Sequence, residues 1–479
     1  MTYTADQLKQ QHPEFSKNYK RWRFYRDSYQ GGTAYSVGEY LTRYVYESNS
    51  EYINRIEETP YDNHTRSVVE IYNSFLFGQD IKRDYGQLDG DPLLEMFLED
   101  ADYEGRDFTD FMREAHTLAS VYGHSWVIVD KPNMQTQTRA EELALGIRPY
   151  LCVFSAENVT NWHYTRTSMG SYELDYLQVI EEATTEYVVY RVYTPGMVEI
   201  LKVTLDDDIV TVIEQNELAL GYIPAVCVYA NRGQTRGCGV SDVSDIADIN
   251  RAIYNETSEI TQLIRLSNHP SLVCVTGVKA SAGAGAIITM DENTDPGLKP
   301  YLLQPSGQSL DGIRQSIADK ISSIDRIAHI GSIRGTESRT MSGVAMDSEF
   351  KLLQAKLMNR ARGLELAEEQ IMQIWYDWAG TVWDGTITYP DSYNTRDKSR
   401  ELDMLEQAKR ILSMPVLTNT NIEYEITEAV LETIIDDPDS LRELKQSLDL
   451  YPETREIIMP GDEPHSVDNI TENAPETAA

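Results

Sequence analysis

The sequence predicts a multidomain α+β fold that combines long helices with small antiparallel sheets. Apolar residues recur every three or four positions up to about residue 125 and again from residue 241, which is the period of an amphipathic helix. Between residues 125 and 229 the apolar runs are short, rich in β-branched and aromatic residues, and separated by turn-forming clusters, which is typical of strands. With 479 residues, the chain is long enough for several structural units.

The composition is that of an acidic globular protein. Hydrophobic residues make up 41% of the chain and charged residues 25%, so most of it is expected to fold. The formal net charge is −35, and such a surface does not bind DNA strongly by neutralising phosphates. No apolar run reaches the about 18 residues of a membrane span, and the first residues lack the apolar core of a signal peptide. A soluble, unsecreted protein without membrane contact is therefore expected. Its cysteines are expected to be reduced packing thiols, since they form no CxxC pair: Cys152, Cys227, Cys238 and Cys274.

The N-terminal part is predicted to be helical. Apolar stripes at 68–76 and 108–119 each have the helical period. The aromatic and basic run RWRFYRDSYQ (21–30) admits stacking on nucleic-acid bases. An amphipathic helix that packs through Trp22 and Phe24 is the favoured interpretation.

The middle part is predicted to be a mainly antiparallel sheet, because the connections between its strands are short. GHSW (123–126) is interpreted as a helix-to-strand turn, and the acidic trio at 206–208 as a solvated hairpin tip. The predicted strands are WVIVD (126–130), PYLCVF (149–154), EYVVYRVY (186–193), MVEILKVTL (197–205), IVTVIE (209–214) and IPAVCVY (223–229).

From residue 241 the pattern is helical again, interrupted by a short strand-like insert. The first helix is expected to start with Ser241 or Asp242 as its cap and to stop before Pro270. A strand-like run, GTITYPDSY, follows the last long helix. The expected segments are helix 241–267, β insert 268–307, helix 308–330, loop 331–343, helix 344–378, acidic helices within 397–450 and a disordered acidic tail at 460–479.

The loop 331–343 (GSIRGTESRTMSG) lies in the one basic stretch of an acidic chain. Residues 308–362 carry 9 Lys and Arg against 6 Asp and Glu, whereas residues 397–479 carry 7 against 20. Glycines in the loop would let it move between two rigid helices. The charge and the glycines together mark it as a candidate functional segment.

The motifs of common enzymes are absent from the sequence. There is no GxxxxGK[ST], HExxH or GxSxG pattern. DENTDPG (291–297) begins like a calcium loop but has Pro296 where that loop needs glycine. The sequence therefore predicts no cofactor, no metal and no catalytic residue. An enzyme with a site near His124, His163 and the acidic hairpin stays open as an alternative.

The order of these parts resembles the portal proteins of tailed bacteriophages, of the SPP1-like type, over nearly the whole chain. The segments that carry the resemblance are SVGEYLTRYVYESNSEYINRIEETPYDNHTRSVVEIYNSFLFG (36–78), ASVYGHSWVIVDKP (119–132), SDIADINRAIYNETSEITQLIRLSNHPSLV (244–273) and MSGVAMDSEFKLLQAKL (341–357).

The resemblance implies a ring of twelve copies at one capsid vertex, through which double-stranded DNA passes without being read. It implies docking of the large terminase subunit and of a head-completion or adaptor protein, contact with major capsid and scaffolding proteins, assembly in the host cytoplasm and residence in the virion. Another capsid or head–tail adaptor component is the alternative. The implied domains are wing 1–240, stem helix 1 241–267, clip 268–307, stem helix 2 308–330, tunnel loop 331–343, long wing helix and return strand 344–396, crown 397–459 and tail 460–479.

The resemblance also implies three groups of site residues. The DNA-channel loop contains Gly331, Arg334, Gly335, Arg339 and Gly343. Its two arginines either approach DNA phosphates or pair with carboxylates of a neighbouring subunit, such as Glu337. The partner-docking clip contains Val273, Val275, Ile287, Ile288 and Tyr301. The stem residues expected to pack between subunits are Ile246, Ile253, Ile260, Ile313, Ile317 and Ile324.

Overall fold

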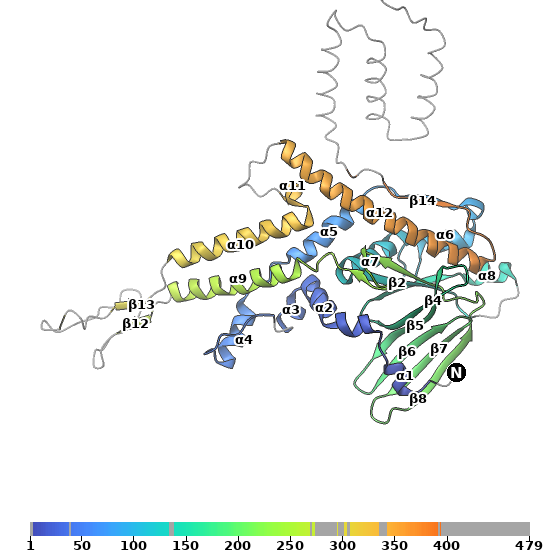
Figure 1. The fold of residues 1–479 in the computed structure, drawn as a ribbon, viewed down its shortest axis with the longest axis horizontal. Helices are drawn as coiled ribbons and strands as arrows, with labels where there is room; N and C mark the ends of the chain where they lie inside the picture. Colours follow the sequence, from blue (N-terminus) through green and yellow to red (C-terminus); the bar gives the residue numbers. More distant parts are fainter. Residues whose placement is uncertain are drawn as a thin grey trace, which may run out of the picture. The chain divides into compact units, whose positions relative to one another are not determined.

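The computed structural model describes residues 3–37, 40–133, 138–268, 271–273, 295, 301–303, 307–334, 343–390 and 393. These residues form an α+β fold whose helical and strand-rich parts follow the predicted order (Figure 1). The acidic helices and tail expected after residue 397 lie outside the described residues. Among the helices that are described, none has the length and hydropathy needed to cross a membrane.

The N-terminal part is helical, as predicted. In α2 the rings of Trp22 and Phe24 are buried, which confirms the amphipathic-helix interpretation and removes both rings from stacking on a nucleic acid. The helices are α1 (Ala5–Lys9), α2 (Pro13–Gln30), α3 (Gly32–Val37), α4 (Asn49–Glu58), α5 (His64–Leu76), α6 (Pro92–Glu99) and α7 (Phe108–Tyr122), with a 3-10 turn η1 (Gly86–Leu88).

A three-stranded antiparallel sheet has the order β3-β2-β9 and is covered by helices. Its strands are β2 (His124–Asp130), β3 (Tyr150–Ser155) and β9 (Ala225–Tyr229), and α8 (Arg139–Leu145) lies between β2 and β3 in the sequence. Side chains of β2 alternate between two cores, as a strand with both faces covered requires. Val127 and Val129 belong to the core that includes α7 and α12, and Trp126 and Ile128 to the core that includes α2.

A five-stranded antiparallel meander follows, with the order β4-β5-β6-β7-β8. Its strands are β4 (Val159–Arg166), β5 (Tyr172–Ala183), β6 (Tyr187–Thr194), β7 (Met197–Thr204) and β8 (Val210–Glu217). The antiparallel arrangement and the acidic hairpin tip at 206–208 are confirmed. Strands β4 and β5 were not predicted, because their apolar residues are diluted by exposed polar ones such as Glu173 and Arg166.

The second half contains a helical hairpin and a long helix. The elements are β10 (Asn231–Arg232), β11 (Gly239–Val240), α9 (Ala247–Asn268), β12 (Ser271–Val273), β13 (Tyr301–Leu303), α10 (Gly307–Ala328), α11 (Gly331–Arg334), α12 (Gly343–Ala379) and β14 (Thr386–Thr388). Strand β14 pairs antiparallel with β1 (Lys82–Asp84), so the strand-like run after the last long helix is confirmed. Helix α9 ends before Pro270, as expected, but starts at Ala247.

The start of α9 differs from the prediction because the two expected caps have other partners. The Ser241 hydroxyl donates to the carbonyl of Val121 at 2.7 Å, and the Asp242 carboxylate accepts from the Arg360 guanidinium. Both side chains are thereby used in tertiary contacts that local sequence does not reveal.

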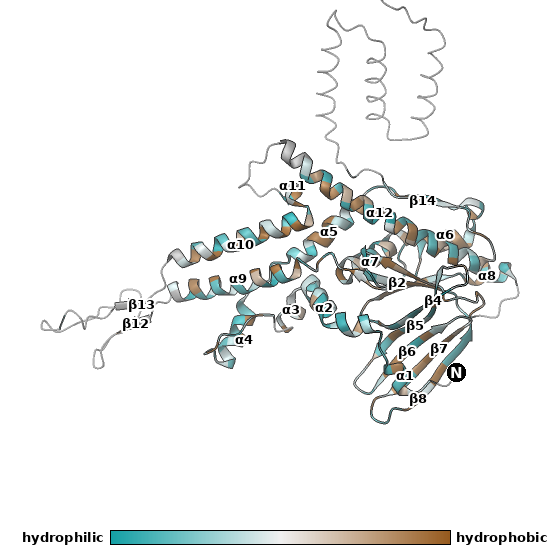
Figure 2. Ribbon diagram, in the orientation of Figure 1, coloured by the Kyte–Doolittle hydropathy of each residue, from teal (hydrophilic) through white to brown (hydrophobic). Residues whose placement is uncertain are grey.

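Helices α9 and α10 lie side by side and extend away from the two sheets (Figure 1). Figure 2 shows strongly hydrophobic stretches in β2, α5 and α7 and an alternation of polar and apolar residues along the hairpin. The main core lies between the three-stranded sheet, α5, α7 and α12, and reaches only the base of the hairpin.

Candidate functional site

The glycine–arginine segment 331–343 starts with a helical turn and not with a loop. Gly331–Arg334 form α11, whose backbone N–H groups at Ile333 and Arg334 donate to the carbonyl of Ile330. The Ile330 side chain is buried in the main core, and it anchors this turn. The expectation of a loop is therefore wrong for the first four residues of the segment.

The glycines of the segment have different settings. A Cβ on Gly331 would lie 2.8 Å from Oε2 of Glu349, the far end of a flexible side chain of α12, so a larger residue here would require only that side chain to move. Gly343 is the first residue of α12, where the expected helix begins. Gly335 and Arg339 lie outside the described residues, as does Glu337.

Arg334 is paired within its own chain. Its Nη1 lies 3.1 Å from Oδ1 of Asp325 at the end of α10 and 3.2 Å from Nδ1 of His64 at the start of α5. The Arg334 side chain is 19% exposed. Within the single chain, the carboxylate partner of Arg334 is Asp325, and pairing with a carboxylate of a neighbouring subunit stays a prediction.

His64 is suited to accept a hydrogen bond from a guanidinium. Burial lowers its pKa, the nearby carboxylate of Asp62 opposes this, and the charge of Arg334 also lowers the pKa; the net shift is downward, so the imidazole is neutral at pH 7 and Nδ1 can accept. Its Nε2 lies 3.1 Å from the Asp62 carboxylate. The backbone N–H of His64 donates to Oδ1 of the buried Asn250 on α9. This cluster joins α5, α9, α10 and α11 at the base of the hairpin.

The six stem isoleucines fall into two groups. Ile246, Ile253 and Ile324 are buried in the core of their own chain, so their side chains are not available to a neighbour. The expectation that these three pack between subunits is corrected on this ground. The other three isoleucines are half-buried. Ile260 follows the buried Ile253 on α9, and Ile313 and Ile317 precede the buried Ile324 on α10.

The clip residues are described only in part. Val273 of β12 is 36% exposed and pairs in register with Tyr301 of β13. Val275, Ile287 and Ile288 lie outside the described residues. A two-stranded sheet of this size is not stable alone in water. The pairing therefore agrees with a β insert at the end of the hairpin and leaves its docking role a prediction.

A buried ionic cluster, which sequence analysis missed, ties α12 to the start of the α9 segment. The Arg360 guanidinium donates to the Asp242 carboxylate, and both side chains are almost fully buried. Lys356 lies 3.8 Å from the same carboxylate and donates to the Tyr72 hydroxyl, which in turn donates to the carbonyl of Ala328. The sequence signal that could have revealed this cluster is the spacing of Lys356 and Arg360, which are four residues apart beside the apolar stripe of the helix and so lie on the same helix face.

The alternative enzyme site is not assembled by the residues predicted for it. His124 is buried, its Nδ1 accepts from the backbone N–H of Gly239, and burial lowers its pKa to about 3. Ser125 donates to the carbonyl of Ala115. His163 is mostly exposed and pairs with Asp175. The helix-to-strand turn at 123–126 is confirmed, since Gly123 ends α7 in the left-handed conformation and β2 follows directly.

The described cysteines and acidic groups form no metal centre. Cys152, Cys227 and Cys238 are free thiols, and burial raises the pKa of Cys152 to about 12 and that of Cys238 to about 11. Such thiols stay protonated and pack as small apolar groups. Within the described ranges, no three His, Cys, Asp or Glu side chains are placed to hold a metal ion together.

No protein-family model matches this sequence, and no curated protein matches it. Among solved structures, a chain from the virion of a native gene transfer agent particle is 9% identical with a TM-score of 0.42, over 81% of this chain and 96% of that chain. A chain from the neck of an empty gene transfer agent particle, computed with C6 symmetry, is 10% identical with a TM-score of 0.45, over 83% of this chain and 99% of that chain. Because both TM-scores are below 0.5, neither likeness identifies the family or the function of this chain.

Proposed function

We propose that this chain is the subunit of a portal-type ring, a structural homo-oligomer that surrounds a channel for double-stranded DNA at one vertex of a phage-type capsid. The observation that carries the proposal is the projecting hairpin of α9 and α10. It leaves the body of the chain and retains apolar side chains that its own pair of helices does not cover.

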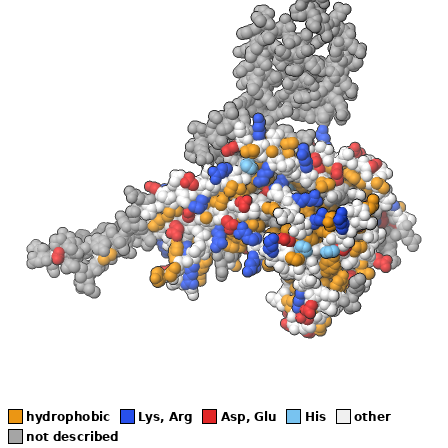
Figure 3. Space-filling view, in the orientation of Figure 1, with side chains coloured by type: hydrophobic (Ala, Val, Ile, Leu, Met, Phe, Trp, Pro, Cys, Tyr) orange, Lys and Arg blue, Asp and Glu red, His pale blue; other side chains and the backbone are white. Residues whose placement is uncertain are grey.

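The outer part of the hairpin needs a partner to bury these side chains. Ile260 and Ile313 are half-buried and Ile264 is 41% exposed. Figure 3 shows apolar side chains interspersed with charged ones along the hairpin. In a ring of twelve copies, each hairpin would lie between two neighbouring hairpins, which would cover such residues on both sides. Head-to-tail contacts between identical subunits form a closed ring when the rotation from one subunit to the next completes a full turn.

The charge distribution suits a channel that DNA passes without sticking. The chain has a formal net charge of −35, which opposes tight binding of a polyanion. Arg334 is neutralised by Asp325 within the subunit, so it adds little net attraction for phosphate in this conformation. A contact from segment 331–343 to the DNA backbone would position the duplex without reading its sequence.

The proposed partners follow from the same assignment. The β insert at the end of the hairpin, 268–307, would dock the large terminase subunit during packaging and a head-completion or adaptor protein afterwards. The helical and sheet-rich part, 1–240, would face the major capsid and scaffolding proteins. The protein would assemble in the host cytoplasm and reside in the virion.

The experiment that tests the proposal measures assembly and its dependence on the hairpin. Negative-stain microscopy and mass photometry of the full chain should give a ring with a central hole. Ile264→Glu should reduce ring formation at least tenfold at equal protein concentration, because it places a charge in a contact that must be dry. Leu143→Glu is the matched control, since Leu143 is 43% exposed on α8, outside the hairpin.

Two results would overturn the proposal. One is a compact monomer at all salt and protein concentrations. The other is equal ring formation by both variants, which would show that the hairpin is not the assembly surface. Circular dichroism of each variant checks that the monomer remains folded.

A further inference from the structure

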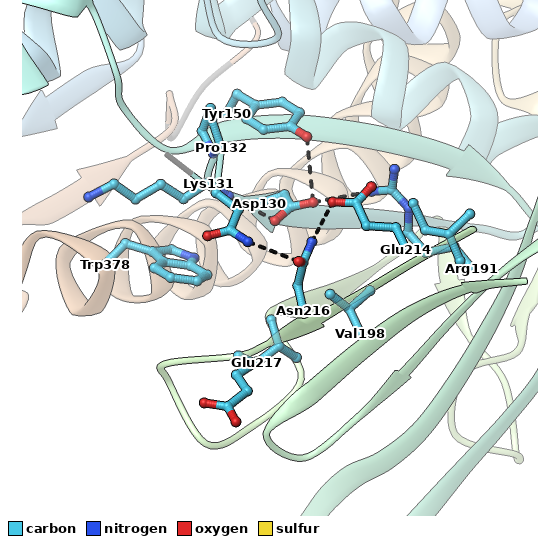
Figure 4. Close-up of a pocket in the computed structure, with 13 residues that line it drawn as sticks. Asp130, Lys131, Pro132, Tyr150, Arg191, Val198, Glu214, Asn216, Glu217 and Trp378 are labelled. Atoms are coloured by element: carbon cyan, nitrogen blue, oxygen red, sulfur yellow. Dashed lines mark hydrogen bonds and ion pairs between the residues drawn. The ribbon is translucent and has the colours of Figure 1, made fainter. Parts of the chain in front are cut away.

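The cavity beside β2 and the end of α12 has a volume of about 270 Å³, and its least exposed carboxylate already has partners (Figure 4). Asp130 accepts from Nη1 of Arg191 at 3.1 Å and from the backbone N–H of Lys131 at 2.8 Å. A second polar cluster is more deeply buried. Four of its atoms have no hydrogen-bond partner among the described residues: Nε2 of His116, Oγ of Ser120, Oδ2 of Asp242 and Nη1 of Arg360. Buried polar atoms cost free energy unless another group satisfies them.

These four side chains meet where α7, α12 and the segment before α9 come together. His116 and Ser120 are four positions apart on α7, so they share one helix face. The backbone N–H of Asp242 donates to the carbonyl of Ser120 at 3.0 Å, and Arg360 on α12 donates to Oδ1 of Asp242. After burial, the charges of Arg360 and Asp242 are the influences on the pKa of His116, which places the ring near both. The four side chains therefore form one cluster.

Hydrogen bonds between α5 and α7 fix the tautomer of His116. The hydroxyl of Thr117 donates to the carbonyl of Arg113 at 2.8 Å, so it accepts from Nδ2 of Asn73, also at 2.8 Å. Oδ1 of Asn73 then lies 2.6 Å from Nδ1 of His116 and accepts its proton. Burial lowers the pKa of His116 to about 4, so the ring carries only this one proton at pH 7. Its Nε2 is therefore an acceptor.

The hydroxyl of Ser120 is available to donate into the cluster. Other helix hydroxyls of this chain donate to the carbonyl four residues earlier, at 2.7 Å for Ser28 and Ser74 and at 2.8 Å for Thr117. Ser120 has the same setting within a helix but makes no such bond. The guanidinium of Arg360 can only donate. With the acceptors Nε2 of His116 and Oδ2 of Asp242, the cluster presents two donors and two acceptors.

A water molecule has the complementary set of two donors and two acceptors. An anion would face the bare nitrogen of His116 and the carboxylate of Asp242, and a metal cation would face the guanidinium of Arg360. Buried waters commonly make about three hydrogen bonds to polar groups that are otherwise unsatisfied. The chemistry of the cluster therefore favours water over either kind of ion.

We propose that one water molecule is bound inside this cluster and makes four hydrogen bonds there. The water donates to Nε2 of His116 and to Oδ2 of Asp242. It accepts from Nη1 of Arg360 and from the hydroxyl of Ser120. It thereby joins α7 and α12 to the segment that leads into the hairpin. The inference goes beyond the ring proposal and does not depend on it, because all four residues belong to a single chain.

The first test is an experimental density map of the full chain at a resolution that shows ordered water. It should contain a peak about 2.7–3.2 Å from at least three of the four atoms. No peak, or a peak within this distance of fewer than three of them, would overturn the inference.

The second test counts internal waters in solution by oxygen-17 magnetic relaxation dispersion. Ser120→Val removes one donor and adds a methyl group about as large as a water, so the variant should lose one long-lived water relative to the wild type. Ser74→Val is the matched control, since Ser74 is an exposed helix serine on α5, and it should keep the wild-type number. Equal numbers in Ser120→Val and the wild type would also overturn the inference. Circular dichroism checks that each variant is folded, and if Ser120→Val does not fold, the wild-type map alone decides.

Discussion

Replacing Arg360 with methionine should be among the most destabilising single changes in this chain. The Arg360 and Asp242 side chains are 2% and 1% exposed, so solvent does not screen their interaction. Removing the guanidinium leaves a buried carboxylate whose remaining cation, Lys356, lies 3.8 Å away. Breaking a buried pair from one side costs about 3–5 kcal/mol, and Lys356 should keep the loss near the lower end, at about 3 kcal/mol.

The assay is urea denaturation of the full chain at pH 7, followed by far-UV circular dichroism. Arg362→Met is the matched control, because Arg362 is exposed on the same helix, and it should change the free energy of unfolding by less than about 0.5 kcal/mol. The double variant Arg360→Met/Asp242→Asn removes both charges of the buried pair and should regain part of the lost stability, since no carboxylate is left buried without a partner. Lys356 also loses this carboxylate, but its side chain is 24% exposed and can be solvated.

The reasoning is refuted by either of two outcomes. If Arg360→Met costs no more than Arg362→Met, the buried pair does not hold α12 to the body of the chain. If the double variant is as unstable as the sum of its single variants, the cost comes from lost packing and not from an unpaired charge.

Three further predictions concern the helix-to-strand turn and the glycine–arginine segment. Because burial lowers the pKa of His124 to about 3 from about 6.5 in the unfolded chain, only the unfolded state takes up this proton, and stability falls as the pH falls through that window. The free energy of unfolding, measured by urea denaturation between pH 6 and 4.5, should therefore fall less steeply in His124→Asn, by about 1.4 kcal/mol per pH unit. An equal slope in the variant and the wild type would contradict this prediction. Gly123→Ala should lower the melting temperature more than Gly221→Ala: both glycines have a positive φ, but only at Gly123 would the new Cβ meet backbone atoms, at 2.6 Å. Equal shifts in a thermal scan would argue against this. Arg339→Ala should leave ring assembly intact and change DNA packaging or retention, and unchanged packaging would retire its DNA-contact role. Arg334→Ala also removes the partner of the buried Asp325 and should lower the free energy of unfolding, which Arg339→Ala should not.

The sequence predicted the elements whose periodicity is strong. The long helix was expected at 344–378 and is Gly343–Ala379, and the helix expected at 308–330 is Gly307–Ala328. In both, the apolar residues recur regularly over many turns, so the helical period outweighs local irregularities. The strands β4 and β5 were missed because one face is polar and exposed, and the alternation is diluted.

The site was harder to predict because its contacts join distant segments. Arg334 was recognised as a charged residue in a basic stretch, but its partners, Asp325 and His64, are set by how α5, α10 and α11 meet. The stem isoleucines were correctly placed on helices. Which of them are buried depends on where the hairpin leaves the body, and this left Ile260 and not Ile253 partly uncovered. The spacing of residues along the chain predicts neither the partners of Arg334 nor which isoleucines are buried.

The position of segment 331–343 in the assembled protein tests the central claim most directly. A cryo-electron microscopy map of the full-length assembly should show a ring with a central hole, with this segment facing the hole. A ring in which segment 331–343 lies on the outer surface, or a preparation that contains only single chains, would contradict the claim.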